Sequence, residues 1–277
     1  LKYSTRASYS NYASDQEQFN RYNVNPEIVG TIKYDVKRYP TTTDNISWDN
    51  ILNYTAKWGD HDFSVMVGQT LETSTMKRTW AQGTGYGGYD DEFNALNFAQ
   101  FSQSTSGYTT SWTALGLLGR ISYDYKDRYL LQANFRADAS SRFSKKNRWG
   151  YFPSVSAGWK INSESFMQNV DWISLLKLRA GWGQLGNNRI GNNAYATYVG
   201  QQSATYIYGV GMPTIQPGMS ISSYGNSDIL WERTQSTSVG LDFNVLDNRI
   251  STSVDYFIKD THDMLVAVPI VYSSGYT

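Results

Sequence analysis

The chain has 277 residues, equal numbers of basic and acidic side chains (24 each), no cysteine and a mean hydropathy of −0.50. The zero net charge gives no electrostatic argument for nucleic-acid binding, and the lack of cysteine excludes disulfides and thiolate metal sites. No apolar run approaches the 18 residues of a transmembrane helix, whereas membrane β-strands remain allowed because their polar positions keep the mean hydropathy low.

Apolar and polar residues alternate along the whole chain in runs of about 9–11 residues, the length with which a tilted strand crosses a bilayer. In chain order, the nine runs begin at Tyr3, Leu52, Phe63, Leu115, Tyr129, Val155, Leu176, Thr237 and Ile250. Such runs predict an all-β protein, and their common length favours part of a transmembrane antiparallel β-barrel. We therefore expect about nine consecutively paired strands in an open, curved sheet that belongs to a larger barrel.

The run from Tyr129 to Asp138 shows the alternation most clearly. Successive side chains of a strand point to opposite faces, so this run predicts one apolar and one polar face. We expect the convex, lipid-facing side to carry Tyr129, Leu131, Phe135, Ala180, Leu241 and Val254. We expect the concave side to carry Gln132, Arg136, Arg179 and Asp242. Aromatic girdles at the membrane interfaces would account for the 15% aromatic content.

Short and long connections alternate strictly between these runs. The short ones have hairpin-turn chemistry and lie at residues 59–61, 126–128 and 247–248. A fourth connection, residues 162–174, predicts a short helix capped by Ser163. The long, polar ones cover residues 13–44, 77–112, 142–150 and 187–230. This alternation is typical of outer-membrane barrels, with short periplasmic turns and long extracellular loops.

Several segments are similar to a known family. They are LGRISYDYKDRYLL at residues 118–131, RADASSRF at 136–143, WGYFPSVSAGW at 149–159, LKLRAGWGQLGN at 176–187, and WERT at 231–234 leading into VGLDF at 239–243. Together they resemble the carboxy-terminal barrel region of SusC/RagA-type TonB-linked outer-membrane proteins, the TonB-dependent transporters of the Bacteroidota. The resemblance is best from Leu115 to Leu265 and implies a larger barrel with a plugged lumen.

The resemblance also implies a function for the protein to which this region belongs. That function is import of oligosaccharides or peptides across the outer membrane of a Gram-negative bacterium. The implied partners are a SusD-like outer-membrane lipoprotein, outer-membrane lipid, the glycan or peptide substrate, and TonB–ExbB–ExbD reached through an amino-terminal region. Residues 1–277 are then expected to be one partial barrel domain, without plug domain or signal peptide.

No motif in the chain predicts catalysis, a cofactor or a metal. Residues 83–88 match G-x-G-x-x-G, and a dinucleotide site needs a strand before this motif, a helix after it and an acidic residue about 20 positions on. The flanks here indicate a polar, aromatic loop without helical period, so an external loop is the better interpretation. His61 and His262 form no metal-binding pair, and Asp90, Asp91 and Glu92 match no calcium loop. A nucleophile elbow is absent, so we expect no enzyme activity.

Two groups of residues are candidates for binding. The aromatic residues of the long loops suit stacking on sugars or peptide side chains, or else packing between loops or against a lid protein; they are Trp80, Tyr86, Tyr89, Trp112, Tyr206 and Tyr208. The second group is expected to face the lumen, where charged residues most often form structural ladders or plug contacts; it consists of Arg120, Arg136, Asp138, Arg179 and Asp242.

Two other classes of function compete with a transporter. A β-rich carbohydrate-binding surface module without a transport role would bury Leu117, Phe135, Leu178 and Leu241 in a closed, dry core, whereas a transporter exposes them to lipid. An outer-membrane enzyme on a barrel scaffold would need a convergent catalytic cluster, and the sequence contains no candidate for one.

Overall fold

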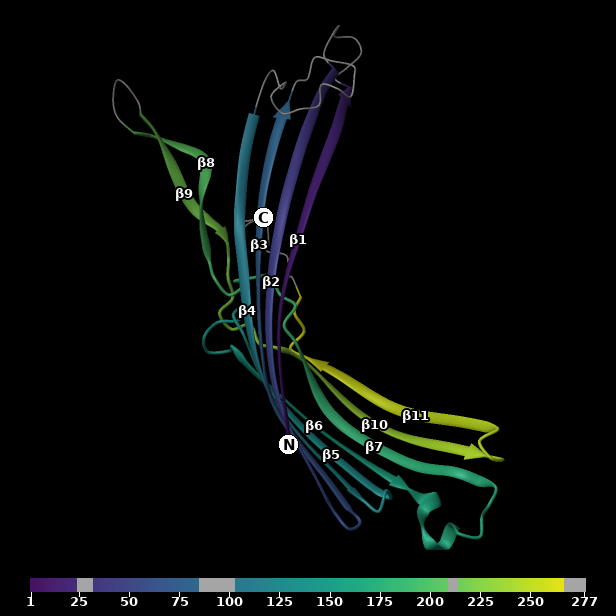
Figure 1. Ribbon diagram of the computed structural model, residues 1–277. Coiled ribbons are helices and arrows are strands. Elements are labelled where there is room, and N and C mark those ends of the chain that lie inside the picture. The colour runs from purple at the N-terminus through teal and green to yellow at the C-terminus, as the bar shows by residue number, and fades with distance from the viewer. Residues whose placement is uncertain (24–31, 85–102, 209–213, 267–277) are drawn as a thin grey trace. The chain divides into compact units, whose positions relative to one another are not determined.

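The computed structural model describes residues 1–23, 32–84, 103–208 and 214–266, and almost all regular structure in it is β (Figure 1). The strands are β1 (Lys2–Asn23), β2 (Ile32–Trp58), β3 (His61–Thr84), β4 (Gln103–Tyr125), β5 (Tyr129–Ser140), β6 (Trp149–Lys160), β7 (Ile173–Asn187), β8 (Tyr198–Tyr208), β9 (Thr214–Ser223), β10 (Glu232–Val245) and β11 (Ile250–His262). Two short 3₁₀ helices, η3 (Ile161–Ser163) and η4 (Ser165–Met167), lie between β6 and β7. Within the described ranges, no helix is long and apolar enough to cross a membrane.

Nine strands form one sheet in the order β1-β2-β3-β4-β5-β6-β7-β10-β11, and β8 and β9 form a separate two-stranded sheet. Each of the nine alternating runs lies in one strand of the large sheet. The pairs from β4 to β7, β10 and β11 are antiparallel. Because β1 and β11 are the two ends of the order, the predicted open sheet is confirmed.

The chain divides into two compact units, and β1 to β4 contribute to both. One unit comprises Leu1–Arg6, Asp49–Leu71 and Ala114–Thr277, and the other comprises Ala7–Trp48 and Glu72–Thr113. The second unit consists largely of strand where loops were expected, so the predicted loops at residues 13–44 and 77–112 were too long. The four strands have 22, 27, 24 and 23 residues, well beyond the expected 9–11.

Side-chain pairs between polar residues explain why these extensions were missed. The hydroxyl of Tyr9 and the amide of Asn11 both donate to Asp44, at 2.7 and 2.8 Å, and Arg38 pairs with Asp15 at 2.9 Å. A strand held by such pairs need not be apolar on one face, so its sequence does not alternate. Residues 187–230 were predicted to be a loop throughout, whereas they contain the β8–β9 hairpin.

The register places the apolar residues on one face and the polar residues on the other. Cα partners run across six strands as Tyr125, Tyr129, Trp159, Leu178, Leu241 and Val254, and one residue further along as Asp124, Leu130, Gly158, Arg179, Gly240 and Asp255. The six residues named above as convex lie on one face, and the four named as concave lie on the opposite face. The separation of the two sets is therefore confirmed, and which face meets lipid stays a prediction.

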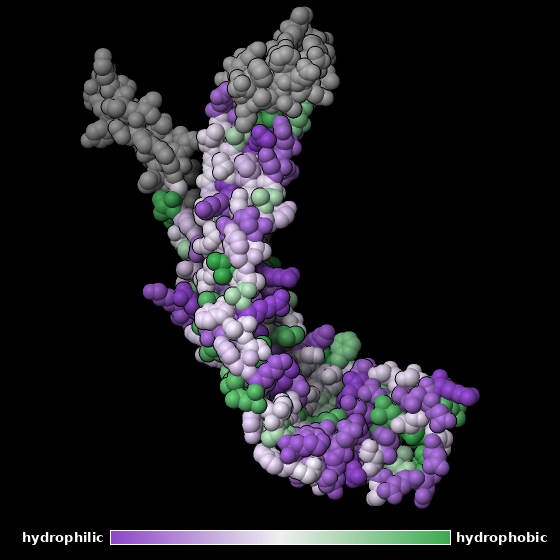
Figure 2. Space-filling view, viewed as in Figure 1, coloured by the Kyte–Doolittle hydropathy of each residue, from purple (hydrophilic) through white to green (hydrophobic). Residues whose placement is uncertain are grey.

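The apolar face is open rather than packed. Leu131, Phe135 and Val239 are 50%, 51% and 49% exposed, and the buried core cluster of the described residues is only Phe143, Phe152 and Trp231. Figure 2 shows hydrophobic residues in patches on the surface of the molecule. A face of this extent normally meets another apolar medium.

The three predicted tight turns are present. Lys126 and Asp127 have φ of 56° and 51°, and Leu246, Asp247 and Asn248 also lie in the left-handed region. The predicted helix cap was wrong, because Ser163 ends η3 and the residue before η4 is Glu164, which makes no side-chain cap hydrogen bond. A single turn of 3₁₀ helix is too short to need the cap that the sequence suggested.

We expect Phe135→Arg in the full-length protein to reduce the yield of folded barrel far more than Arg136→Ala. An Arg facing lipid near the midplane costs about 2–4 kcal/mol, whereas Arg136 lies on the polar face. The heat-modifiable fraction on gel electrophoresis of outer membranes measures the yield. Equal yields for the two variants would contradict the assignment of the faces.

Candidate functional site

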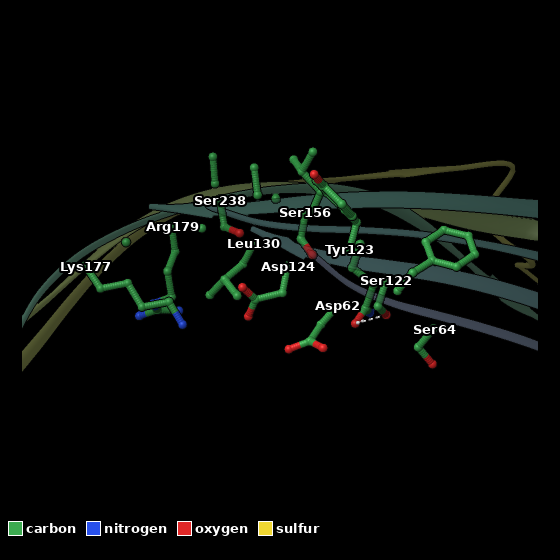
Figure 3. Close-up of a pocket in the computed structure, with 18 of the residues that line it drawn as sticks. Asp62, Ser64, Ser122, Tyr123, Asp124, Leu130, Ser156, Lys177, Arg179 and Ser238 are labelled. Carbon is green, nitrogen blue, oxygen red and sulfur yellow. Dashed lines mark hydrogen bonds between the residues drawn. The ribbon is translucent and has the colours of Figure 1, made fainter. Parts of the chain in front are cut away.

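The polar face carries a hollow of about 940 Å³ in the larger unit (Figure 3). Strands β2 to β7, β10 and β11 contribute to its wall. The polar and charged residues that line it are Thr55, Lys57, Asp62, Ser64, Ser122, Asp124, Gln132, Ser156, Lys177, Arg179, Ser238 and Asp255. Because it opens on the polar side, this hollow is a water-accessible surface rather than part of an apolar core.

Arg179 forms the strongest charge cluster of the hollow. Its guanidinium lies 2.9 Å from the carboxylate of Asp242 and 3.0 Å from that of Asp255, and it also donates to the Ser253 hydroxyl at 3.0 Å. Since β10 lies between β7 and β11, the Arg179 side chain must cross β10 to reach Asp255. Gly240 provides the space, because a Cβ there would overlap the Asp255 carboxylate and approach the Arg179 guanidinium to 2.9 Å.

The other predicted lumen residues lie on the same face and contact their neighbours in the wall. Arg136 pairs with Asp138 at 2.7 Å, and a Cβ on Gly116 would lie 2.7–2.8 Å from both side chains. Arg120 donates to Asn134 at 2.7 Å. Register thus brings the five charged candidates onto one face as structural wall contacts, and a role toward substrate stays a prediction.

A second cluster lies where β5, β6 and β10 meet the long connections. The Phe143 and Trp231 rings stack with centroids 4.8 Å apart, and Phe152 meets Trp231 edge-on at 5.5 Å. Glycines surround it: a Cβ at Gly150 would lie 2.5 Å from the Phe152 ring, and one at Gly186 would overlap that ring. These residues come from four of the segments that carried the family resemblance, and no local pattern predicts that they meet.

Hydrogen bonds join the two connections around this cluster. Arg142 donates to the carbonyl of Asn188 at 3.1 Å, Ser144 to that of Ser227 at 2.8 Å, and the Trp231 indole to that of Arg148 at 3.1 Å. The β5–β6 connection is therefore fixed to the connection that carries the β8–β9 hairpin.

At the other end of the strands, near the tight turns, one buried carboxylate holds the chain in place. Glu164 accepts hydrogen bonds from Tyr129 at 2.6 Å and Trp159 at 2.9 Å, and pairs with Arg128 at 3.1 Å. The Tyr129 hydroxyl first, then the Trp159 indole, and more weakly the Arg128 charge, lower the pKa of Glu164 below its ordinary value. Sequence reasoning missed Glu164, because nothing in the sequence shows that three partners converge on it.

The structure does not show the aromatic residues that were predicted as loop contacts to form one cluster within the described ranges. Trp80 lies in β3 and Trp112 in β4, within the expected long loop but in strands. Tyr86 and Tyr89 lie outside the described residues, as do residues 85–88 of the glycine-rich motif and Asp90–Glu92. Tyr206 and Tyr208 lie two positions apart in β8, but their side chains are not described. The described residues contain no cluster of metal-binding side chains.

A family model described as "TonB dependent receptor-like, beta-barrel" matches residues 1–277. The chain belongs to the TonB-dependent receptor β-barrel family. TonB-dependent receptor SusC of Bacteroides thetaiotaomicron is 35% identical over 235 residues, which are 84% of this chain and 22% of SusC. TonB-dependent receptor P39 of Formosa agariphila is 33% identical over 237 residues, covering 83% of this chain and 21% of P39.

A solved structure supports the same fold. The RagAB peptide transporter superposes with a TM-score of 0.80 at 24% identity, over 99% of this chain and 30% of the matched chain. The chain therefore spans less than a quarter of the two curated TonB-dependent receptors and under a third of the solved one. The resemblance to SusC/RagA-type proteins and the fold class expected from the sequence are both confirmed.

We expect Gly186→Ala to loosen the connections around the aromatic cluster, because the new methyl group overlaps the Phe152 ring. Overpacking of this kind costs about 1–3 kcal/mol. Faster cleavage in the 187–230 connection during limited proteolysis of the full-length protein is the expected result. Gly191→Ala is the matched control, since a Cβ there has nothing within 4 Å; equal cleavage rates would contradict the prediction.

Glu164 should make stability depend on pH. A carboxyl with a lowered folded-state pKa stabilises the fold above its unfolded pKa of about 4.3, and this contribution is lost as the pH falls through the folded-state pKa. Urea unfolding of the full-length protein in lipid should therefore show a smaller loss of stability at low pH for Glu164→Gln than for the native protein. Asp171→Asn, which changes an exposed acid of the same segment, should keep the native pH dependence.

Proposed function

We propose that residues 1–277 form part of the barrel wall of an outer-membrane TonB-dependent transporter, with the apolar face toward lipid and the polar face toward the lumen. The observation that carries the proposal is the two-faced, nine-stranded open sheet of a receptor-barrel family. Lipid would cover an apolar face that is otherwise exposed to water. Further strands of the same protein would pair with the free edges of β1 and β11.

Aromatic side chains at the tight-turn edge support the membrane assignment. Trp58 and Trp172 are 62% and 56% exposed, and Trp172 lies edge-on to Phe243 with centroids 6.3 Å apart. Tyr125 stacks on Tyr129 at 6.3 Å. Exposed aromatic rings in this position are typical of the girdle at a membrane–water interface.

The competing surface module is not favoured by the exposure of the diagnostic residues. Leu117, Phe135, Leu178 and Leu241 are 45%, 51%, 39% and 39% exposed. A closed, dry core would bury all of them. Lipid contact accounts for their exposure, so the transporter remains the better function.

The proposed substrate is an oligosaccharide or a peptide. SusC is 35% identical to this chain, and the matched solved structure is that of a peptide transporter. The proposed partners are a SusD-like lipoprotein at the long connections and TonB–ExbB–ExbD on the periplasmic side. The loop aromatics, Trp80, Tyr86, Tyr89, Trp112, Tyr206 and Tyr208, are proposed to contact substrate or the lipoprotein.

Deleting residues 83–88 from the full-length protein should spare barrel insertion but weaken ligand uptake or binding of the lipoprotein. The segment begins at the end of β3, and the sequence that follows it is rich in glycine and aromatic residues, as recognition loops often are. Uptake of labelled oligosaccharides and peptides by complemented cells, together with pull-down of the lipoprotein, measures the effect. Unchanged values in both assays would show that recognition lies elsewhere, and absence of uptake even by the native protein would refute the proposed function.

A further inference from the structure

Arg78 lies over an aromatic ring rather than beside a carboxylate. The central carbon of its guanidinium, on β3, is 5.0 Å from the centroid of the Tyr39 ring on β2. The strands β2, β3 and β4 contain no acidic residue around this contact, in residues 36–43, 73–84 and 103–113. Within the described ranges, Arg78 has no ion-pair partner. Its positive charge is therefore balanced by no carboxylate that the structure describes.

The contacts between β3 and β4 show which residue faces Arg78. The hydroxyls of Thr73 and Thr113 are 3.2 Å apart, and a Cβ on Gly107 would lie 3.0 Å from the carbonyl oxygen of Arg78. The two strands therefore run antiparallel, and five positions beyond the threonine pair Arg78 faces Tyr108. Because five is an odd number, this pair lies on the face opposite to the two threonines.

Aromatic rings from three neighbouring strands surround this guanidinium. Tyr39 lies beneath it on β2, and Tyr108, which is 51% exposed, lies beside it on β4. Trp80 follows two positions after Arg78 on β3 and so shares its face. All four residues belong to the second of the two compact units. Together they form a flat aromatic surface with one cation in it, which we call the Arg78 platform.

A guanidinium stacked on a ring keeps its N–H groups available at its edge. Those groups form a rigid fork that matches a planar anion such as a carboxylate, or the oxygens of a sulfate. Lys37 shares the face of Tyr39 by alternation, but Asp35 lies two positions from it on the same face. Arg78, without an acid close to it in these strands, is therefore the cation to which we assign the anion.

The platform suits a sugar better than a peptide chain. Each of β2, β3 and β4 has a neighbouring strand on both sides, so their backbone groups are not free to bind an extended peptide as an added strand. What the platform offers instead is side chains, and flat aromatic faces with polar tips suit stacking on sugar rings.

We propose that Arg78, Tyr39, Trp80 and Tyr108 form a subsite for an acidic oligosaccharide. The aromatic rings stack on the sugars, and the Arg78 guanidinium binds a carboxylate or sulfate group that one of them carries. The proposal rests on the proposed function, which turns this face toward the lumen. It narrows the substrate from an oligosaccharide or a peptide to a glycan with negative charge.

Uptake by complemented cells that carry the full-length protein tests the charge preference. The probes are labelled oligosaccharide pairs of equal length on several sugar backbones: a uronate-containing form with its carboxyl-reduced form, and a sulfated form with its desulfated form. The native protein should take up at least one acidic form about tenfold faster than its neutral counterpart, as expected for one charge-assisted hydrogen-bonded pair. The pair that shows the difference identifies the anion as carboxylate or sulfate.

Three variants assign the preference to the platform. Arg78→Gln should abolish the ratio between acidic and neutral forms, whereas Lys77→Gln, which removes the next charge along β3 on the opposite face, should keep it. Tyr108→Ser should slow both forms alike, because stacking does not depend on the charge. Each variant is compared with itself on two forms of one ligand, so a lower yield of folded barrel does not change the ratio.

The outcomes separate this proposal from the proposed function. Equal uptake of acidic and neutral forms by the native protein, or an unchanged ratio in Arg78→Gln, would overturn the subsite. Loss of the ratio in Lys77→Gln as well would also overturn it, because the effect would then be one of net charge. Uptake of peptides alone would refute the subsite and leave the transporter standing, and uptake of neither class would refute both.

Discussion

Antiparallel register is the constraint on which the rest of this structure depends. Directly paired residues share a face, so the alternation in one strand must agree with that of both neighbours. A slip of one residue between β5 and β6 would bring Gly158 opposite Tyr129 and carry the polar row onto the apolar face. The apolar row from Tyr125 to Val254 and the charged row beside it therefore exist together or not at all.

Much of the large sheet could be predicted from sequence, because residues that share a face recur in each strand with a period of two. All nine strands, the two faces and the three tight turns follow from alternation and from turn residues such as Asp127 and Asn248. The outer parts of β1 to β4 could not be predicted, because pairs such as Tyr9–Asp44 hold them through polar contacts. The β8–β9 hairpin was also missed, because residues 187–230 were interpreted as a single long, polar connection.

The contacts at the candidate site were harder to predict from the sequence. Alternation places Arg136 and Arg179 on the polar face, but it cannot tell that Gly116 and Gly240 make room for their side chains. Nor can it show that Phe143, Phe152 and Trp231 meet, because they lie in different connections and strands. Local pattern thus predicts the facing of a residue, whereas its partners depend on register and on side-chain length.

The glycines of the polar face connect these observations. In a strand, a glycine weakens local packing and costs conformational entropy, so its presence needs a compensating gain. At Gly116 and Gly240 the gain is an arginine that lies along the wall and reaches a carboxylate. At Gly150 and Gly186 it is the ring of Phe152, which fills the space beside the long connections. On the polar face, Arg179 reaches across a neighbouring strand, and Gly240 leaves the room that a Cβ would take from its guanidinium.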